Sequence, residues 1–277
     1  MQQPMQTMIH PVLRLAAIDL DDTLLGTDKW ISPENAEAVQ RLQQTGIRCV
    51  LASGRRHENM LRFHQRLALE GFIVSCNGAL VKDADTREVL REQLVPAPLA
   101  AEIVEIGDAL GLTQNYYHTD GGLYVREETR WTSLYETRTE SQVNVHGELE
   151  DFHGENALKI IWIDAPERIQ TLFLEMKARF GETLYITTTD PEYLEFMAQG
   201  VSKAVGVATV AEILGIEREA VVAFGDGNND VPLLEWAGIS YAMDHARPAA
   251  QAAADRITPS GDPNTSFARA VAHLLDG

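Results

Sequence analysis

Residues 12–25 read VLRLAAIDLDDTLL, a short apolar run that passes directly into an acidic loop. The apolar part, residues 12–18, is typical of a strand that is buried on both faces of a parallel sheet. Ligand sites in open α/β sheets lie at the carboxyl ends of strands, and this is the position of Asp19 and Asp21. The stretch therefore predicts an α/β sheet with a reactive site at the end of its first strand.

Buried strands alternate with helices on both sides of a middle segment, residues 83–197. Short apolar runs predict further strands at residues 47–52, 72–76, 221–224 and 239–243. Helices are expected from Ser32-Pro33 to a stop at Gly46, at residues 56–70, 201–214, 230–236 and 246–254, and in a last segment that ends near Leu275. This alternation implies a doubly wound, mainly parallel, Rossmann-like α/β core.

The middle segment has the pattern of an α+β domain. Polar-tipped hairpin strands are predicted within residues 79–94. Further strands are expected at residues 113–118, 122–125, 158–163, 184–189 and 193–197, with helices at residues 98–110 and 166–180. We therefore expect a core domain of residues 1–82 and 198–277, interrupted by an inserted domain of residues 83–197 whose sheet is antiparallel in part.

Composition argues against several classes of function. The 41 acidic and 23 basic side chains give a net charge of −18, and no basic stripe of the kind that binds nucleic acid is present. No apolar stretch approaches membrane-spanning length, and residues 1–11 lack the apolar region of a signal peptide, so we expect a cytoplasmic protein. Cys49 and Cys76 lie in apolar runs and are expected to be buried, reduced thiols. The sequence does not specify an oligomeric state.

The first chemical signal is the pair of carboxylates in the acidic loop. Asp19 can attack phosphorus and form an aspartyl-phosphate. Asp21, two residues further on, can protonate a leaving group and then activate water, if its pKa can be tuned. Taken alone, two such aspartates are more often an acidic turn after a strand.

Three further polar segments follow predicted strands or open predicted helices. Ser53 and Gly54 can bind phosphate through a hydroxyl and backbone N–H groups, although a simple helix cap would look the same. Lys203 can pair with a phosphate or with Asp19, although most lysines lie on the surface. Residues 225–230, GDGNND, offer hard oxygen ligands for Mg²⁺, with a polar turn as the plain alternative. Together the four segments supply the parts of a phosphoryl-transfer site, and their mutual consistency favours that interpretation.

Residues 225–230 do not fit two better-known motifs. A dinucleotide-binding fingerprint requires glycine at position 230, which is Asp230. A calcium-binding EF-hand loop requires glycine at 231 and an acidic residue at 237, which are Val231 and Ala237.

The four segments, in this order, resemble the haloacid dehalogenase (HAD) superfamily, specifically its Cof-type phosphatases. Residues 75–79, SCNGA, and 194–197, LEFM, resemble Cof-type signatures on either side of the insert, and Ala204 departs from the glycine that is frequent there. The resemblance implies a HAD-like core with an α/β cap domain of the C2B type inserted after the third core strand. It also implies that the extension before Val12, which is longer than usual in the family, is disordered.

The resemblance also implies roles for individual residues. Asp19 would be the nucleophile and Asp21 the acid and base. The substrate's phosphate would be bound by Leu20, Ser53, Gly54, Lys203 and Asn229. Mg²⁺ would be bound by Asp19, Asp21 (through its backbone carbonyl) and Asp226, and Asp230 would support the metal or Lys203.

We therefore expect a Mg²⁺-dependent phosphatase, a phosphoric monoester hydrolase acting on small phosphorylated metabolites such as sugar phosphates or cofactor-type phosphates. A phosphomutase with the same intermediate is the first alternative, and a non-catalytic metabolite-binding protein is the second. The insert is expected to select the leaving group. Its candidate contact residues are Tyr116, Tyr117, His118, Tyr124, Arg126, Trp131 and His146, although ordinary packing is the common role of such residues.

Overall fold

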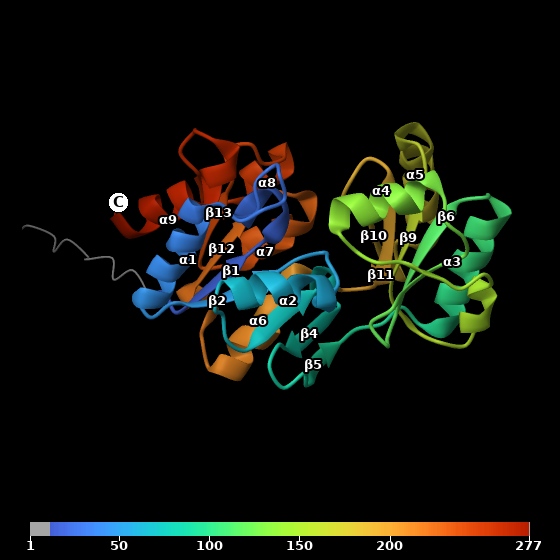
Figure 1. Ribbon diagram of the computed structural model, residues 1–277, viewed down its shortest axis with the longest axis horizontal. Coiled ribbons are helices and arrows are strands. Elements are labelled where there is room, and N and C mark those ends of the chain that lie inside the picture. Colours follow the sequence, from blue (N-terminus) through green and yellow to red (C-terminus); the bar gives the residue numbers. More distant parts are fainter. Residues whose placement is uncertain (1–11, 277) are drawn as a thin grey trace, which may run out of the picture.

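The computed structural model describes residues 12–276, which form two sheets lying side by side, each with its own helices (Figure 1). The expectation of disorder for residues 1–11 lies outside the described residues. Cys49 and Cys76 are free and buried, as predicted. Among residues 12–276, no helix has both the length and the apolar character needed to cross a membrane.

The larger sheet has eight strands and contains the acidic loop's strand at its centre. In spatial order the strands are β14 (Arg256–Ile257), β13 (Ile239–Ala242), β12 (Val221–Gly225), β1 (Leu15–Ile18), β2 (Arg48–Ala52), β3 (Phe72–Ser75), β4 (Leu80–Asp83) and β5 (Val89–Glu92). The strands from β14 to β3 pair in parallel, and β4 and β5 add an antiparallel hairpin at one edge. Because β12, β1 and β2 are neighbours, the loops that follow them meet at one edge of the sheet.

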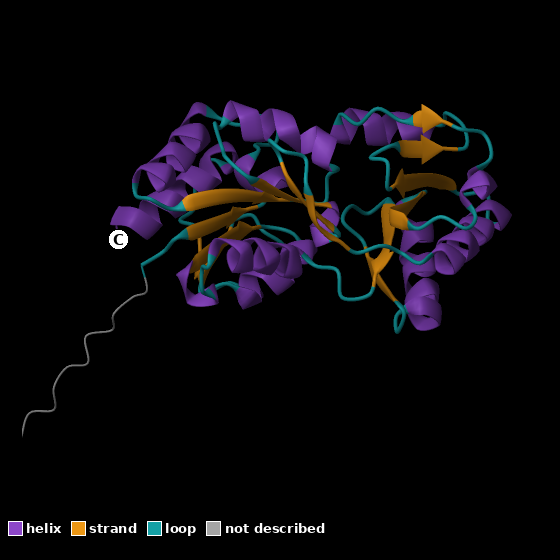
Figure 2. Ribbon diagram, turned by 90° about the horizontal axis from the view of Figure 1, so that it is seen from below, coloured by secondary structure: helices purple, strands orange, loops and turns teal. Residues whose placement is uncertain are grey.

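Helices cover both faces of this sheet (Figure 2). They are α1 (Pro33–Gln44), α2 (His57–Arg66), α6 (Lys203–Leu214), α7 (Val231–Trp236), α8 (Pro248–Ala253) and α9 (Ser266–Asp276). Local chemistry sets the start of α1 as expected, because the Ser32 side chain accepts the Asn35 N–H and Pro33 occupies the first turn. This arrangement confirms the predicted doubly wound α/β class with an additional α+β part.

The smaller sheet has six strands and is antiparallel except for its last pair. Its order is β10 (Leu184–Thr187), β11 (Tyr193–Ala198), β9 (Ala157–Ile163), β6 (Thr113–His118), β7 (Leu123–Val125) and β8 (Asn144–Val145). Helices α3 (Ala97–Ala109) and α5 (Pro166–Phe180) share an apolar cluster with Ile160 and Trp162 of β9. The alternate residues Ile161 and Ile163 belong to a second cluster with Tyr135 of α4 (Arg130–Thr139). Alternation along β9 thus places α4 on the opposite face from α3 and α5.

Among the strands and α-helices of residues 12–276, three were not predicted. Strands β8 and β14 have two residues each, too few for a pattern. Helix α4 buries only Thr132 and Tyr135, so it lacks the broad apolar stripe that marks a helix in a sequence, although Thr129 and Thr132 form a capping box at its start.

The division into core and inserted domain remains a proposal, and strand pairing refines its first limit. Strand β5 lies beyond residue 82 yet pairs with β4 in the larger sheet. The chain reaches the smaller sheet only after Glu92, and it returns after Ala198 at the end of β11. We therefore propose residues 93–198 for the insert, which we call the cap from here on.

Candidate active site

The acidic loop forms a single wide turn directly after β1. Leu25 donates its N–H to the carbonyl of Leu20, five residues earlier, and Asp22 adopts a left-handed backbone with φ of 59°. This turn lets Asp19 and Asp21 border one cavity, of about 390 Å³, at the end of the strand. The side chain of Leu20 is buried in the apolar core, so only its backbone can serve a ligand.

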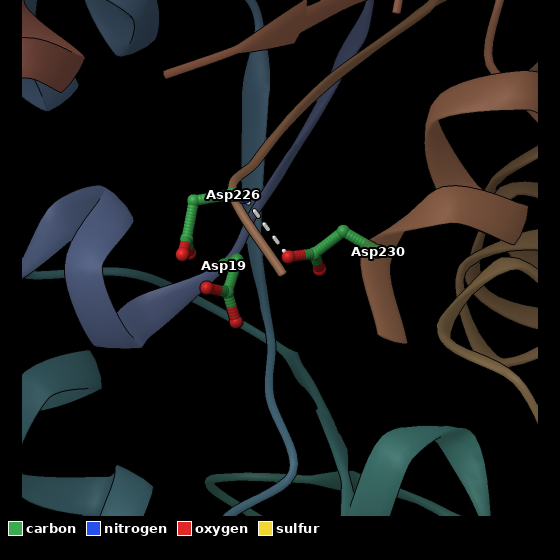
Figure 3. Close-up of side chains that lie close together, drawn as sticks. All are labelled: Asp19, Asp226 and Asp230. Carbon is green, nitrogen blue, oxygen red and sulfur yellow. Dashed lines mark hydrogen bonds between the residues drawn. The ribbon is translucent and has the colours of Figure 1, made fainter. Parts of the chain in front are cut away.

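Three carboxylates meet at this edge of the sheet (Figure 3). Asp19, Asp226 and Asp230 each offer an oxygen within 4.8 Å of the other two. Asp230 accepts the N–H groups of Asp226 and Gly227 at 3.0 and 2.9 Å, so its carboxylate shapes the loop after β12. Asp226 accepts the Thr23 hydroxyl at 3.0 Å. A set of oxygen donors only is the chemistry that Mg²⁺ prefers, so these residues fit the expected metal.

Lys203 places its charge among these carboxylates. It opens α6, where the Ser202 side chain caps the helix by accepting the Val205 N–H. The ammonium group donates to Asp19 Oδ1 at 2.5 Å and to Asp230 Oδ1 at 2.6 Å, and the side chain is 1% exposed. Burial lowers the pKa of Lys203, but the two carboxylates outweigh it, so the net pKa is raised and the lysine is charged.

One lysine does not neutralise three carboxylates. Burial, with a further contribution from Asp230, raises the pKa of Asp19 well above its usual range, although Lys203 opposes this. Burial and Asp230 also raise the pKa of Asp226 to about 7. Crowded, buried carboxylates of this kind are stabilised in their ionised form by a cation, which is an electrostatic argument for a metal at this position.

The loop after β2 supplies the phosphate-binding candidates and one further residue, Arg55, for which the sequence suggested no role. Ser53 is buried, and its Oγ accepts the Arg55 N–H at 3.2 Å. The guanidinium of Arg55 donates to both carboxylate oxygens of Asp21, at 2.8 and 2.7 Å. The Asp21 carboxylate therefore points at Arg55 and is not part of the three-carboxylate cluster, which leaves its backbone carbonyl as the only expected contact with a metal.

Asn229 and Asn77 meet at the other side of the cavity. The Asn229 side chain lines the cavity and donates its amide N–H to Asn77 Oδ1 at 2.9 Å. Asn77 is buried and has a left-handed backbone, with φ of 56°. Gly54 packs against it so closely that a Cβ there would lie 3.1 Å from Asn77 Oδ1. The segments after β2, β3 and β12 are thus in contact with one another.

The structure brings together all the residues that the sequence named for the chemistry, because their loops share one edge of the sheet. It adds residues that no short motif marks. Around the same cavity the further lining residues are Asp22, Lys29, Arg55, Gly227 and Arg247 from the core, and Tyr135, Arg138, Thr139, Thr189, Asp190, Tyr193 and Glu195 from the cap. The cap residues come from the end of α4, the connection between β10 and β11, and β11 itself.

The cap residues that the sequence suggested do not line this cavity in the described chain. Tyr116 stacks on Phe152 with ring centroids 4.9 Å apart, and Tyr124, His118 and His146 also pack against Phe152. They lie on or near β6, β7 and β8, away from the end of α4. These side chains have groups that could contact a leaving group, but their position in the cap sheet places them away from the cavity.

The other three suggested cap residues are also engaged elsewhere. Arg126 forms ion pairs with Asp108, Glu148 and Glu150. Tyr117 is buried, and its hydroxyl contacts that of Tyr135. The Trp131 ring packs under the guanidinium of Arg130, 4.5 Å from the ring centroid.

Comparison with known proteins shows which protein family the chain belongs to. The family described as haloacid dehalogenase-like hydrolase matches residues 16–271. The chain belongs to this family of hydrolases. The resemblance seen in the sequence, and the assignment as an enzyme of the HAD-like phosphatase type, are thereby confirmed.

The similar proteins match over almost the whole chain. A 5-amino-6-(5-phospho-D-ribitylamino)uracil phosphatase of Bacillus subtilis is 28% identical over 269 residues, which are 95% of this chain and 96% of the relative. An HMP-PP phosphatase of Serratia proteamaculans is 25% identical over 272 residues, covering 95% and 94%. The crystal structure of a haloacid dehalogenase-like hydrolase from Bacteroides thetaiotaomicron aligns with a TM-score of 0.85 and 25% identity, covering 95% of this chain and all of the other.

Proposed function

We propose that this hydrolase is a Mg²⁺-dependent phosphatase that works through an aspartyl-phosphate on Asp19. The observation that carries the proposal is the position of the Asp19 carboxylate, held by Lys203 at the end of β1 beside Asp226 and Asp230. A carboxylate held by one oxygen can attack phosphorus with the other, and the positive charge nearby stabilises the charge that develops on the phosphoryl oxygens.

The reaction has two displacements. Asp19 Oδ2 forms a bond to phosphorus as the ester P–O bond breaks, and Asp21 gives its proton to the leaving oxygen. Asp21 then takes a proton from water, whose oxygen bonds to phosphorus as the bond to Asp19 breaks and phosphate leaves. Mg²⁺, bound by Asp19, Asp226 and the Asp21 backbone carbonyl with Asp230 in support, would neutralise the phosphate charge. Ser53, the Leu20 and Gly54 backbone, Lys203 and Asn229 would orient the phosphoryl oxygens.

Asp21 must change protonation state between the two steps. Burial raises its pKa, but the hydrogen bonds and charge of Arg55 outweigh this, so its pKa is below the usual value and the group is ionised. This form suits the second step, the activation of water. The negative phosphoryl group of a bound substrate raises the pKa of a neighbouring carboxyl, which favours the protonated form needed in the first step.

We propose small phosphorylated metabolites, either sugar phosphates or cofactor-type phosphates, as substrates. The names of two relatives, a phosphoribitylaminouracil phosphatase and an HMP-PP phosphatase, support this class. The cavity of about 390 Å³, with cap residues on one wall, is a suitable size for a small leaving group. We further propose that the protein acts in the cytoplasm, without nucleic acid or membrane as partner.

The test is phosphate release from a panel of phosphorylated metabolites in the presence of Mg²⁺. Reaction in ¹⁸O-labelled water distinguishes the alternatives, because hydrolysis releases labelled phosphate, whereas a phosphomutase returns unlabelled phosphate to a sugar. Turnover of at least one metabolite with label in the phosphate is the expected result. Binding of metabolites without turnover would identify a metabolite-binding protein and contradict the proposal.

A further inference from the structure

A chain of buried polar groups, joined by hydrogen bonds, crosses from the cap to the core next to the cavity. Its cap members are Lys159 on β9 and Glu195 on β11, which are 1% and 3% exposed. Its core members are Asn77, after β3, and the carbonyl group of Gly54, after β2. Burying such groups costs free energy unless each has a hydrogen-bond partner. It therefore matters whether every member of this chain is paired.

The contacts run without a gap from one sheet to the other. Lys159 Nζ donates to Glu195 Oε2 at 3.2 Å and to the carbonyl oxygen of Gly54 at 3.0 Å. The amide of Asn77 donates to the same Glu195 oxygen at 3.2 Å. Thr189, in the cap connection that lines the cavity, donates its hydroxyl to Glu195 Oε1 at 2.8 Å. Glu195 therefore joins the wall of the cap to two loops of the core.

Each arm of this chain ends on a residue proposed to bind phosphate. Through Asn77, Glu195 reaches the Asn229 amide. Through Lys159, it reaches the peptide that links Gly54 to Arg55, whose N–H donates to Ser53 Oγ. A peptide group is planar, so a bond to its carbonyl oxygen also sets the direction of its N–H. Lys159 therefore helps to orient the Ser53 hydroxyl.

Stability alone is a poor explanation for this ion pair. Burial lowers the pKa of Lys159, but Glu195 outweighs it, so the pKa of the lysine is raised and the lysine is charged. Replacing a buried ion pair by uncharged side chains of similar volume often leaves stability unchanged or increases it. A role in holding other residues in place accounts better for a charged pair at this junction.

We propose that Glu195 and Lys159 are positioning residues. They hold Ser53 and Asn229 in the geometry for phosphoryl transfer and fix the position of these two residues relative to the cap. The inference rests on the proposed function. It predicts that loss of the pair reduces turnover of every substrate in the same proportion, because the affected groups bind the phosphoryl group common to all substrates.

The decisive variant is the double substitution Lys159→Met with Glu195→Gln. It removes both charges together, so no buried charge remains unpaired, and the melting temperature should stay close to that of the wild type. Turnover should nevertheless fall on the order of 10- to 100-fold, mostly in kcat, as for other residues that orient a reactive group. A second variant, Asn77→Gly, cuts the other arm and keeps the left-handed backbone, which glycine adopts readily. It should show a similar loss in kcat.

Arg126→Met is the matched control, because it removes a cap cation whose partners lie away from the cavity, and it should keep wild-type kcat. A purely structural role predicts that the double variant melts at a lower temperature while the folded protein keeps normal kcat. Normal kcat in the folded double variant would overturn the inference, whatever its melting temperature. An inactive wild type would count against the proposed function instead. In that case amide hydrogen exchange decides: residues 53–56 should exchange faster in the double variant, and unchanged exchange there would refute the positioning role.

Discussion

Arg55 and Asp21 form a two-point contact in which the guanidinium donates Nε and Nη2 to the two carboxylate oxygens, at 2.8 and 2.7 Å. The same guanidinium donates Nη1 to the carbonyl of Thr139 at the end of α4, at 3.3 Å. The proposed acid and base is thus oriented by a core residue that also contacts the cap. This contact links the end of α4, through Arg55, to the carboxylate of Asp21.

The first prediction concerns this contact. Replacing Arg55 by methionine removes the charge that lowers the pKa of Asp21, so that pKa rises. The basic limb of kcat/KM against pH, on which Asp21 loses the proton that the first step requires, should move to higher pH, and the maximum should fall roughly 100-fold. Arg41→Met, which removes an exposed arginine paired with Asp276, is the control. An unchanged pH profile in the Arg55 variant would show that the contact does not act on the catalytic carboxyl.

The second prediction concerns the nucleophile. Asp19→Asn should reduce kcat by several orders of magnitude, on the order of 10⁴-fold or more, because the covalent intermediate cannot form. Its melting temperature without metal should equal or exceed that of the wild type, because one of three crowded carboxylates is neutralised. Steady-state kinetics and thermal denaturation provide both values. Near-wild-type turnover by the folded variant would refute the aspartyl-phosphate mechanism.

The third prediction links metal and pH. The folded, metal-free protein keeps a proton on Asp226 up to about pH 7, whereas an ordinary aspartate loses it near pH 4. A folded-state pKa that is raised stabilises the acidic form, so this contribution is lost as the pH rises through that window. Mg²⁺ replaces the proton, so it should raise the melting temperature more at about pH 8 than at about pH 5.5.

The same metal should be required for activity. Protein treated with EDTA should lose turnover and regain it when Mg²⁺ is added back. Full turnover after thorough chelation, or a stabilisation by Mg²⁺ that does not depend on pH, would argue against a metal at Asp19 and Asp226.

The fourth prediction concerns substrate choice by the cap. Tyr193 lines the cavity, and its buried hydroxyl finds no hydrogen-bond partner among the described residues, so a leaving group that reaches this hydroxyl can supply one. Tyr193→Phe should change the ratio of kcat/KM between two metabolites by about 10-fold. It should spare p-nitrophenyl phosphate, whose leaving group is small and generic. Tyr124→Phe, remote from the cavity, serves as the control. An identical substrate ranking in the wild type and the Tyr193 variant would remove the cap hydroxyl from the specificity site.

Much of the fold could be predicted because its signals are local. The apolar run before Asp19 forms β1, the Ser32-Pro33 pair starts α1, and the alternation of strands and helices indicates a doubly wound sheet. Even in the cap, the strand at residues 113–118 and the helix at residues 166–180 agree with the expectation, because both patterns are regular. Helix α4 has no such pattern, and its position depends on the cluster around Tyr135.

The sequence by itself determined where the candidate residues lie, since Asp19, Ser53, Lys203 and Asp226 each follow a strand or open a helix, and these are short-range features. Only the tertiary structure decided which side chains meet. Lys203 contacts Asp19 across 184 residues of chain, Arg55 contacts Asp21, and Glu195 joins the cap to Asn77. It also decided that Tyr193 borders the cavity while Tyr116 packs against Phe152. Residue type sets what a side chain can do, whereas contacts between distant segments follow from how the sheets and helices pack, which no local pattern records.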